Sequence, residues 1–128
     1  MARATCIVYV EDDPRVFEAT LMLFRTFGYR VVGGTGVEEV LEALKSEAAV
    51  PDVVVADLML GDGPHGLEVV RAVRKRCGRT VPAIIMTGDD WSGPAGQSPL
   101  PHCRMLRKPV AAGRLTGLID TLAREAVG

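Results

Sequence analysis

Short apolar runs and longer amphipathic segments alternate along most of this chain. The apolar runs predict five strands, which lie within residues 51–63 and at residues 5–10, 29–34, 81–87 and 103–107. Between these runs, apolar side chains recur every three or four residues, as they do along one face of a helix. Because the strands are almost continuously apolar, they are expected to form one parallel sheet with helices on both faces. The pattern therefore predicts an open, doubly wound α/β domain.

Capping residues indicate where two of the predicted helices begin. Asp13 is a favourable N-cap and Pro14 suits the first helical position, so a helix is expected from there to Gly28, a natural stop. Thr35 and Glu38 have the spacing of a capping box, in which each side chain bonds to the other residue's backbone. We expect the second helix to begin at this box.

Residues 88–102 interrupt the alternation. The segment contains three glycines and three prolines, and its only large apolar residues are Trp91 and Leu100. Each interior proline costs a helix about 3 kcal/mol and each glycine roughly 1 kcal/mol, with no apolar stripe to offset the loss. We therefore expect a loop with at most one helical turn where the layout calls for a fourth helix.

Length and composition fit a single domain over residues 1–128. The formal net charge of −1 gives no indication of a nucleic-acid surface. No apolar run approaches the ~20 residues of a membrane span, and the N-terminus lacks a signal-peptide pattern. Cys6, Cys77 and Cys103 have neither zinc-site nor disulfide spacing and are expected to be reduced. We expect a cytoplasmic protein that directly contacts neither nucleic acid nor a membrane.

Polar residues follow four of the predicted strands where each strand ends. Glu11 and Asp12 come after the first strand, Asp57 after the third, Thr87 after the fourth and Lys108 after the fifth. Each has an ordinary structural explanation when taken alone: a helix cap, a strand-end hydroxyl or a surface lysine. Together they predict a site, because the carboxyl ends of parallel strands meet at one edge and ligands bind there.

The side chains at this edge indicate phosphoryl chemistry. Three crowded carboxylates repel one another unless a cation is present, and a hard oxygen site with room for water suits Mg²⁺. Thr87 and Lys108 could hold the remaining oxygens of a phosphoryl group, which supplies the positioning and charge neutralisation that its transfer needs. Asp57 would be the nucleophile, since a carboxylate can form an aspartyl-phosphate.

Four motifs, "IVYVEDDP", "PDVVVADLML", "PAIIMTG" and "RKPV", together resemble the receiver domain of two-component response regulators over nearly the whole chain. The resemblance implies a flavodoxin-like sheet of five parallel strands. It implies that Glu11 and Asp12 are the acidic pair, with Asp12 favoured as the direct Mg²⁺ ligand. It further implies that Asp57 is the phosphoacceptor and that the backbone carbonyl of Met59 completes the metal site.

The same resemblance assigns the residues that handle the phosphoryl group. Thr87 would be the switch hydroxyl and Lys108 the phosphoryl-binding lysine. The Lys108–Pro109 bond is expected to be cis, as it usually is in the family.

The chain departs from the family pattern at three places. Met105 stands where the family often has an aromatic switch residue, which puts the coupling of that residue to Thr87 in doubt. Gly61 replaces a common proline, and the loop from there to Gly66 is one residue longer than usual. The third departure is the missing pattern for a fourth helix.

The resemblance implies a signalling module that takes a phosphoryl group from a phosphohistidine. The donor would be a histidine kinase or a histidine phosphotransfer protein, and the recipient of the signal an unidentified output protein. Such a module catalyses only its own phosphorylation and dephosphorylation. We expect no output domain here, which leaves three possibilities open: a free-standing receiver, a receiver paired with a separate output protein, and the receiver of a hybrid kinase.

The sequence leaves two other functions open. The first is a pseudo-receiver that binds partners without phosphorylation. The second is a Mg²⁺-dependent aspartyl phosphohydrolase of the haloacid-dehalogenase type. That class needs a second aspartate two residues after the nucleophile, where this chain has Met59.

The loop predicted at residues 88–102 can be tested by backbone amide exchange. We expect fast exchange across residues 91–101 in the free protein, because the prolines and glycines prevent a continuous helix. Addition of beryllofluoride, a phosphoryl mimic, should change the exchange rates at 88–102. This change is expected because phosphorylation at Asp57 would pull Thr87 inward and shift the adjoining loop. A protected helix in the free protein would contradict the loop, and identical rates with and without beryllofluoride would contradict its response to phosphorylation.

Overall fold

Five parallel strands form one sheet in this computed structural model, which describes residues 3–88 and 100–127. The strands are β1 (Cys6–Val10), β2 (Arg30–Gly34), β3 (Val53–Asp57), β4 (Ala83–Thr87) and β5 (Cys103–Arg107). Their order across the sheet is β2–β1–β3–β4–β5, with every neighbouring pair parallel. The central strand β3 therefore lies between β1 and β4, and the predicted doubly wound sheet is confirmed.

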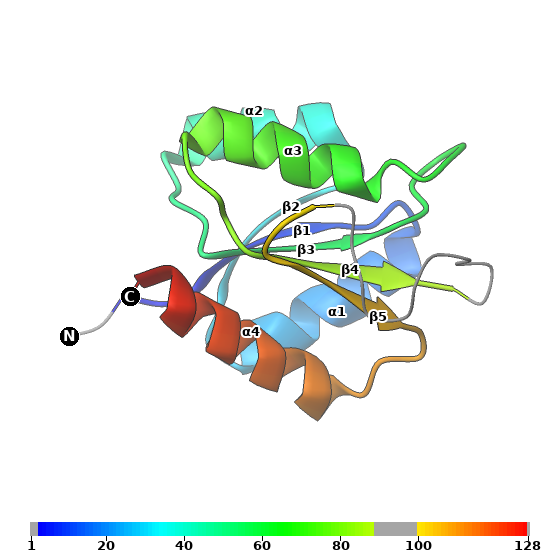
Figure 1. Ribbon diagram of the computed structural model, residues 1–128. Coiled ribbons are helices and arrows are strands. Elements are labelled where there is room, and N and C mark those ends of the chain that lie inside the picture. The colour runs from blue at the N-terminus through cyan, green and yellow to red at the C-terminus, as the bar shows by residue number, and fades with distance from the viewer. Residues whose placement is uncertain (1–2, 89–99, 128) are drawn as a thin grey trace.

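Helices cover both faces of this sheet (Figure 1). They are α1 (Pro14–Thr26), α2 (Val37–Glu47), α3 (Gly66–Cys77) and α4 (Ala112–Val127). Helices α2 and α3 pack on one face and α1 and α4 on the other, each pair over its own apolar cluster. All residues of β1, β3 and β4 are buried, because both faces of these strands are covered.

The start of α1 agrees with the predicted cap. The Asp13 carboxylate accepts hydrogen bonds from the backbone N–H groups of Arg15 and Val16, and Pro14 occupies the first turn. After the helix, Gly28 has a φ of +82°, a conformation that glycine adopts without steric cost. The chain then turns into β2, which begins at Arg30.

The capping box predicted between Thr35 and Glu38 is wrong. Helix α2 begins at Val37 with Gly36 as its N-cap, and Gly36 has no side chain to cap with. The backbone N–H and the hydroxyl of Thr35 both donate to the Glu39 carboxylate, at 3.2 and 2.8 Å. Because the helix starts two residues after Thr35, the glutamate one position farther along is the one that reaches back.

Residues 89–99 lie outside the described part of the chain, and with them Trp91. The loop predicted over 88–102 therefore stays a prediction. Among residues 3–88 and 100–127, no helix combines the length and apolar character that crossing a bilayer demands. Of the three cysteines, Cys6 and Cys103 are buried and Cys77 is half-buried.

Helix α3 begins directly against the backbone of β3. The N–H of Gly66 donates to the carbonyl of Leu58 at 2.9 Å. A Cβ atom added to Gly66 would lie 2.1 Å from the carbonyl oxygen of Asp57, which is far inside van der Waals contact. Glycine at this position therefore lets the helix approach the strand end that carries Asp57.

This close approach predicts a large effect of one methyl group. Gly66→Ala should lower the free energy of unfolding by about 3 kcal/mol, because the clash is with backbone and cannot be relieved by a rotamer change. Gly117→Ala in α4 is the matched control: its Cβ would meet open space and should stabilise the protein by about 1 kcal/mol. Urea denaturation measures both, and equal stabilities for the two variants would contradict the proposed clash.

Candidate functional site

Asp57 lies at the centre of the carboxyl edge of the sheet. Strand pairing aligns Val10 of β1 with Ala56, and Met86 of β4 with Asp57, so these three strands end nearly level. The residues that follow β1 and β4 therefore flank Asp57 on either side. Glu11 and Asp57 are both buried, with 3% and 7% of their surface exposed. The arrangement places two carboxyl groups in a region from which water is largely excluded.

Lys108 supplies positive charge to this region. Its ammonium Nζ donates to Asp57 Oδ2 at 2.6 Å, and the lysine side chain is 42% exposed. The backbone N–H of Lys108 donates to the carbonyl of Thr87 at 2.7 Å, which extends the pairing of β4 and β5 by one residue. The Lys108–Pro109 peptide bond is cis, as the resemblance implied.

Thr87 ends β4 and is buried. Its hydroxyl donates to the carbonyl of Leu106 on β5 at 3.4 Å, which is long for such a bond. Little energy would be lost if this hydroxyl turned to another acceptor. Thr87 and Lys108 thus lie side by side at the ends of the neighbouring strands β4 and β5, and the Thr87 hydroxyl can change its hydrogen-bond partner.

The buried carboxyl of Glu11 prefers to keep its proton. Burial is the largest cause, and the hydrogen bond and negative charge of Asp57 add to it, so the pKa of Glu11 rises to about 8. The ammonium of Lys108 opposes this rise but does not cancel it. The repulsion expected from the sequence is therefore present at Glu11 and Asp57.

Asp12 ties two loops together. It is exposed, and its Oδ2 accepts a hydrogen bond from the backbone N–H of Gly61 at 2.7 Å. Gly61 has a φ of +63° in a tight turn whose ends, Leu60 and Gly63, are bridged. Gly61, which stands in place of the family's common proline, thus forms the turn and also donates its N–H to Asp12. Nothing in the sequence indicated this contact.

Two further side chains stand near the site. His65, the residue before α3, contacts the carboxylates of Asp62 and Glu68 at 2.8 and 3.3 Å, and these contacts raise its pKa. Met105 is buried in the cluster beneath α2 and α3. A flexible thioether therefore fills the place where the resemblance anticipates an aromatic ring.

The oxygen donors at this edge fit a magnesium ion. In the described part of the chain, no three His, Cys, Asp or Glu side chains form a cluster that could hold a metal ion by themselves. Mg²⁺ does not require such a cluster, because it commonly binds one or two protein carboxylates and keeps several waters. A buried carboxyl that retains its proton beside a second one is also a place where a cation would be stabilising.

Both a family model and a curated protein match most of this chain. The family model described as the response regulator receiver domain matches residues 7–120. Among curated proteins, the phyllosphere-induced regulator PhyR of Methylorubrum extorquens is 28% identical over 117 residues, which cover 91% of this chain and 43% of that protein. The chain thus spans less than half the length of this relative.

Solved structures show the same fold. A response regulator receiver domain protein from Clostridium thermocellum has a TM-score of 0.79 at 22% identity, with 94% of this chain and 95% of that chain covered. The anti-anti-sigma factor PhyR from Bartonella quintana has a TM-score of 0.75 at 21% identity, with 98% and 49% covered.

The raised pKa of Glu11 predicts a pH-dependent stability. Between the ordinary value of 4.5 and about 8, the folded protein keeps a proton that the unfolded chain has lost. The Glu11 contribution to the free energy of unfolding should therefore fall as pH rises through this window, by up to about 1.4 kcal/mol per pH unit. Urea unfolding at pH 5, 6.5 and 8 measures it.

In this experiment Glu11→Gln should remove that part of the slope, whereas Glu38→Gln, on the exposed side of α2, should keep it. Added Mg²⁺ should raise the stability of the wild type most at pH 8, where the carboxyl is free of its proton. A slope that survives Glu11→Gln unchanged would show that another group is responsible.

Proposed function

The chain belongs to the response regulator receiver domain family, and from that premise we propose that it is a phosphoacceptor module with Asp57 as the acceptor. Receiver domains are signalling modules rather than metabolic enzymes. The observation that carries the assignment is the 2.6 Å contact between the Lys108 ammonium and the Asp57 carboxylate at the centre of the sheet edge. Lys108 follows β5, which lies two positions from β3 in the sheet. An aspartate that merely ended a strand would not require a lysine from so distant a strand.

The proposed reaction is transfer of a phosphoryl group from a phosphohistidine to Asp57. A carboxylate oxygen of Asp57 attacks phosphorus, and the phosphorus–nitrogen bond to the imidazole breaks. The imidazole leaves with the bonding electrons and takes up a proton, while Asp57 becomes an acyl phosphate. The donor would be a histidine kinase or a histidine phosphotransfer protein.

Lys108 and Thr87 would hold the phosphoryl oxygens during and after this transfer. Once the carboxylate is esterified, the Lys108 ammonium would turn from Asp57 Oδ2 to the new oxygens, which its partly exposed side chain allows. The Thr87 hydroxyl would leave its long bond to Leu106 for the same group. Two donors beside Asp57 would stabilise the charge on the transferring group.

Magnesium would be held directly by oxygens of Asp12 and Asp57 and by the backbone carbonyl of Met59, with Glu11 as the second member of the acidic pair beside them. When bound, it would neutralise charge between the carboxylates and the phosphoryl group. Asp12 has a second carboxylate oxygen besides the one that accepts from Gly61, so it could contribute without losing that contact.

The output would be a change in a protein-binding surface. Phosphorylation adds a charge of about −1.5 to −2, which biases the arrangement of the residues around Thr87. The PhyR proteins that the chain resembles are a regulator and an anti-anti-sigma factor by name. Because this chain matches only about half of each, we propose a partner protein as the target without assigning their activity to it.

Phosphorylation by a small donor tests the assignment. With phosphoramidate and Mg²⁺, the wild type should gain one phosphoryl group in intact-mass spectra, and Asp57→Asn should gain none, because an amide cannot form the acyl phosphate. Asp62→Asn, which removes an exposed carboxylate from the neighbouring loop, should behave as the wild type. Labelling of Asp57→Asn to the wild-type extent, or no labelling of the wild type, would overturn the proposal.

A further inference from the structure

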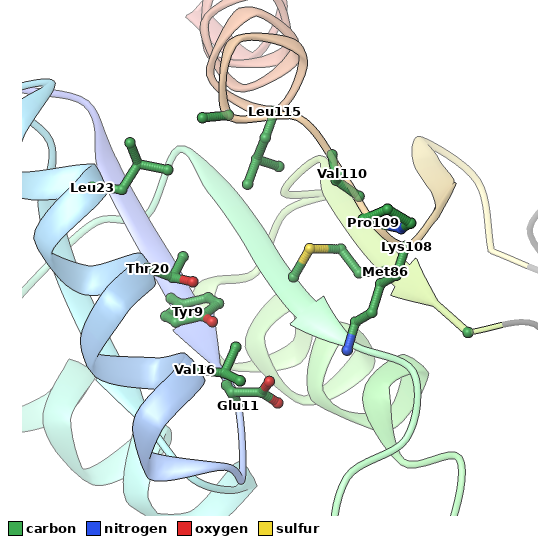
Figure 2. A pocket seen from close by; sticks show the side chains of 12 residues that line it. Tyr9, Glu11, Val16, Thr20, Leu23, Met86, Lys108, Pro109, Val110 and Leu115 are labelled. Carbon is green, nitrogen blue, oxygen red and sulfur yellow. The ribbon is translucent and has the colours of Figure 1, made fainter.

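A cavity of about 480 Å³ lies behind the acceptor edge, between α1 and the start of α4 (Figure 2). Its walls are mostly apolar and include Val16, Leu23, Met86, Val110 and Leu115. This volume falls within the range of about 300–1,000 Å³ that is typical of pockets for small molecules. The cavity is therefore large enough for a compact organic ligand.

A buried hydroxyl lines this cavity without a protein partner. Tyr9 has none of its surface exposed. Its ring is held in place by stacking on Phe17 and by an edge-on contact with Phe24, each with ring centroids 5.4 Å apart. The Thr20 hydroxyl, which also lines the cavity, lies close enough to act on the pKa of Tyr9, but no described residue forms a hydrogen bond of ordinary geometry with the Tyr9 hydroxyl. Buried hydroxyls of tyrosine usually have such a bond, so this one is available to a ligand.

The cavity has a charged end and an apolar end. Figure 2 shows the ends of Glu11 and Lys108 toward the acceptor edge and the side chains of Leu23 and Leu115 at the opposite end. The Tyr9 hydroxyl lies between them. The ammonium of Lys108 is already paired with Asp57. The middle of the cavity thus offers a hydrogen bond but no unpaired charge.

We propose that this cavity binds a small neutral molecule with an apolar body and one hydroxyl, carbonyl or amide group. The apolar body would contact Leu23 and Leu115, and the polar group would form the hydrogen bond that Tyr9 lacks. A charged ligand is disfavoured, because it would lose its hydration in the apolar part without gaining an opposite charge. The proposal concerns binding only and does not depend on phosphorylation of Asp57.

Two probes of similar shape test the site: p-cresol, which carries a hydroxyl, and toluene, which does not. Titrations followed by ¹H–¹⁵N NMR should show saturable shifts in β1, α1 and residues 108–112, with p-cresol binding more tightly than toluene. Tyr9→Phe should weaken p-cresol binding about tenfold, the effect of one lost hydrogen bond, and leave toluene binding unchanged. This variant should fold, because the hydroxyl has no protein partner among the described residues.

A matched pair of variants locates the binding. Ala112 lines the cavity and its exposed neighbour Ala111 does not, so Ala112→Phe should abolish binding of both probes and Ala111→Phe should not. Absence of saturable binding to the wild type would overturn the proposal. So would equal effects of Tyr9→Phe on both probes, or binding that survives Ala112→Phe. These readouts are independent of Mg²⁺ and phosphodonor, so they stand apart from the phosphorylation experiment.

Discussion

The contact between Lys108 and Asp57 stabilises the buried carboxylate at the carboxyl edge of the sheet. Burying ionised carboxyl groups is costly unless opposite charge or hydrogen bonds accompany them. Here Lys108 brings its ammonium to 2.6 Å from Asp57, and the neighbouring Glu11 keeps its proton instead. The lysine reaches this place because its backbone is bonded to Thr87, which continues the pairing of β4 and β5. The strand order thus determines the charge balance of the site.

Strand β1 contributes residues both to the carboxyl edge of the sheet and to the apolar interior beside it. Its side chains alternate between the two faces of the sheet, so Val8 and Val10 pack beneath α2 and α3, whereas Ile7 and Tyr9 pack against α1 and α4. Glu11 continues the second series and lines the same cavity as Tyr9. The same alternation therefore places the Glu11 carboxyl at the site and the Tyr9 hydroxyl inside the protein.

Much of this organisation could be predicted from local patterns. Apolar runs that stop on polar residues revealed the strand ends, and the order of the strands then brought Glu11, Asp57 and Lys108 together. The first capping residue, Asp13, was also found correctly. The box at Thr35 was misassigned by one position, because the glutamate partner depends on where the helix begins and not on spacing alone.

Other features could not be predicted because they arise from contacts between distant segments. The bond from Gly61 to Asp12 joins residues 49 positions apart, and a glycine carries no sign of which acceptor its N–H will find. The Tyr9 hydroxyl is buried beside the cavity because α1 packs over this face of the sheet. Such features emerge only when the packed structure is known.

The tight start of α3 also bears on how this chain can vary over evolutionary time. Gly66 lies so close to the Asp57 carbonyl that neither the strand end nor the first turn of the helix can shift without disturbing Asp57. Additional residues can be accommodated only in the outer part of the intervening loop, where Gly61 and Asp62 form an exposed turn. Lineages that lengthen this loop would therefore diversify the surface around Asp57 while Asp57 itself keeps its place at the strand end.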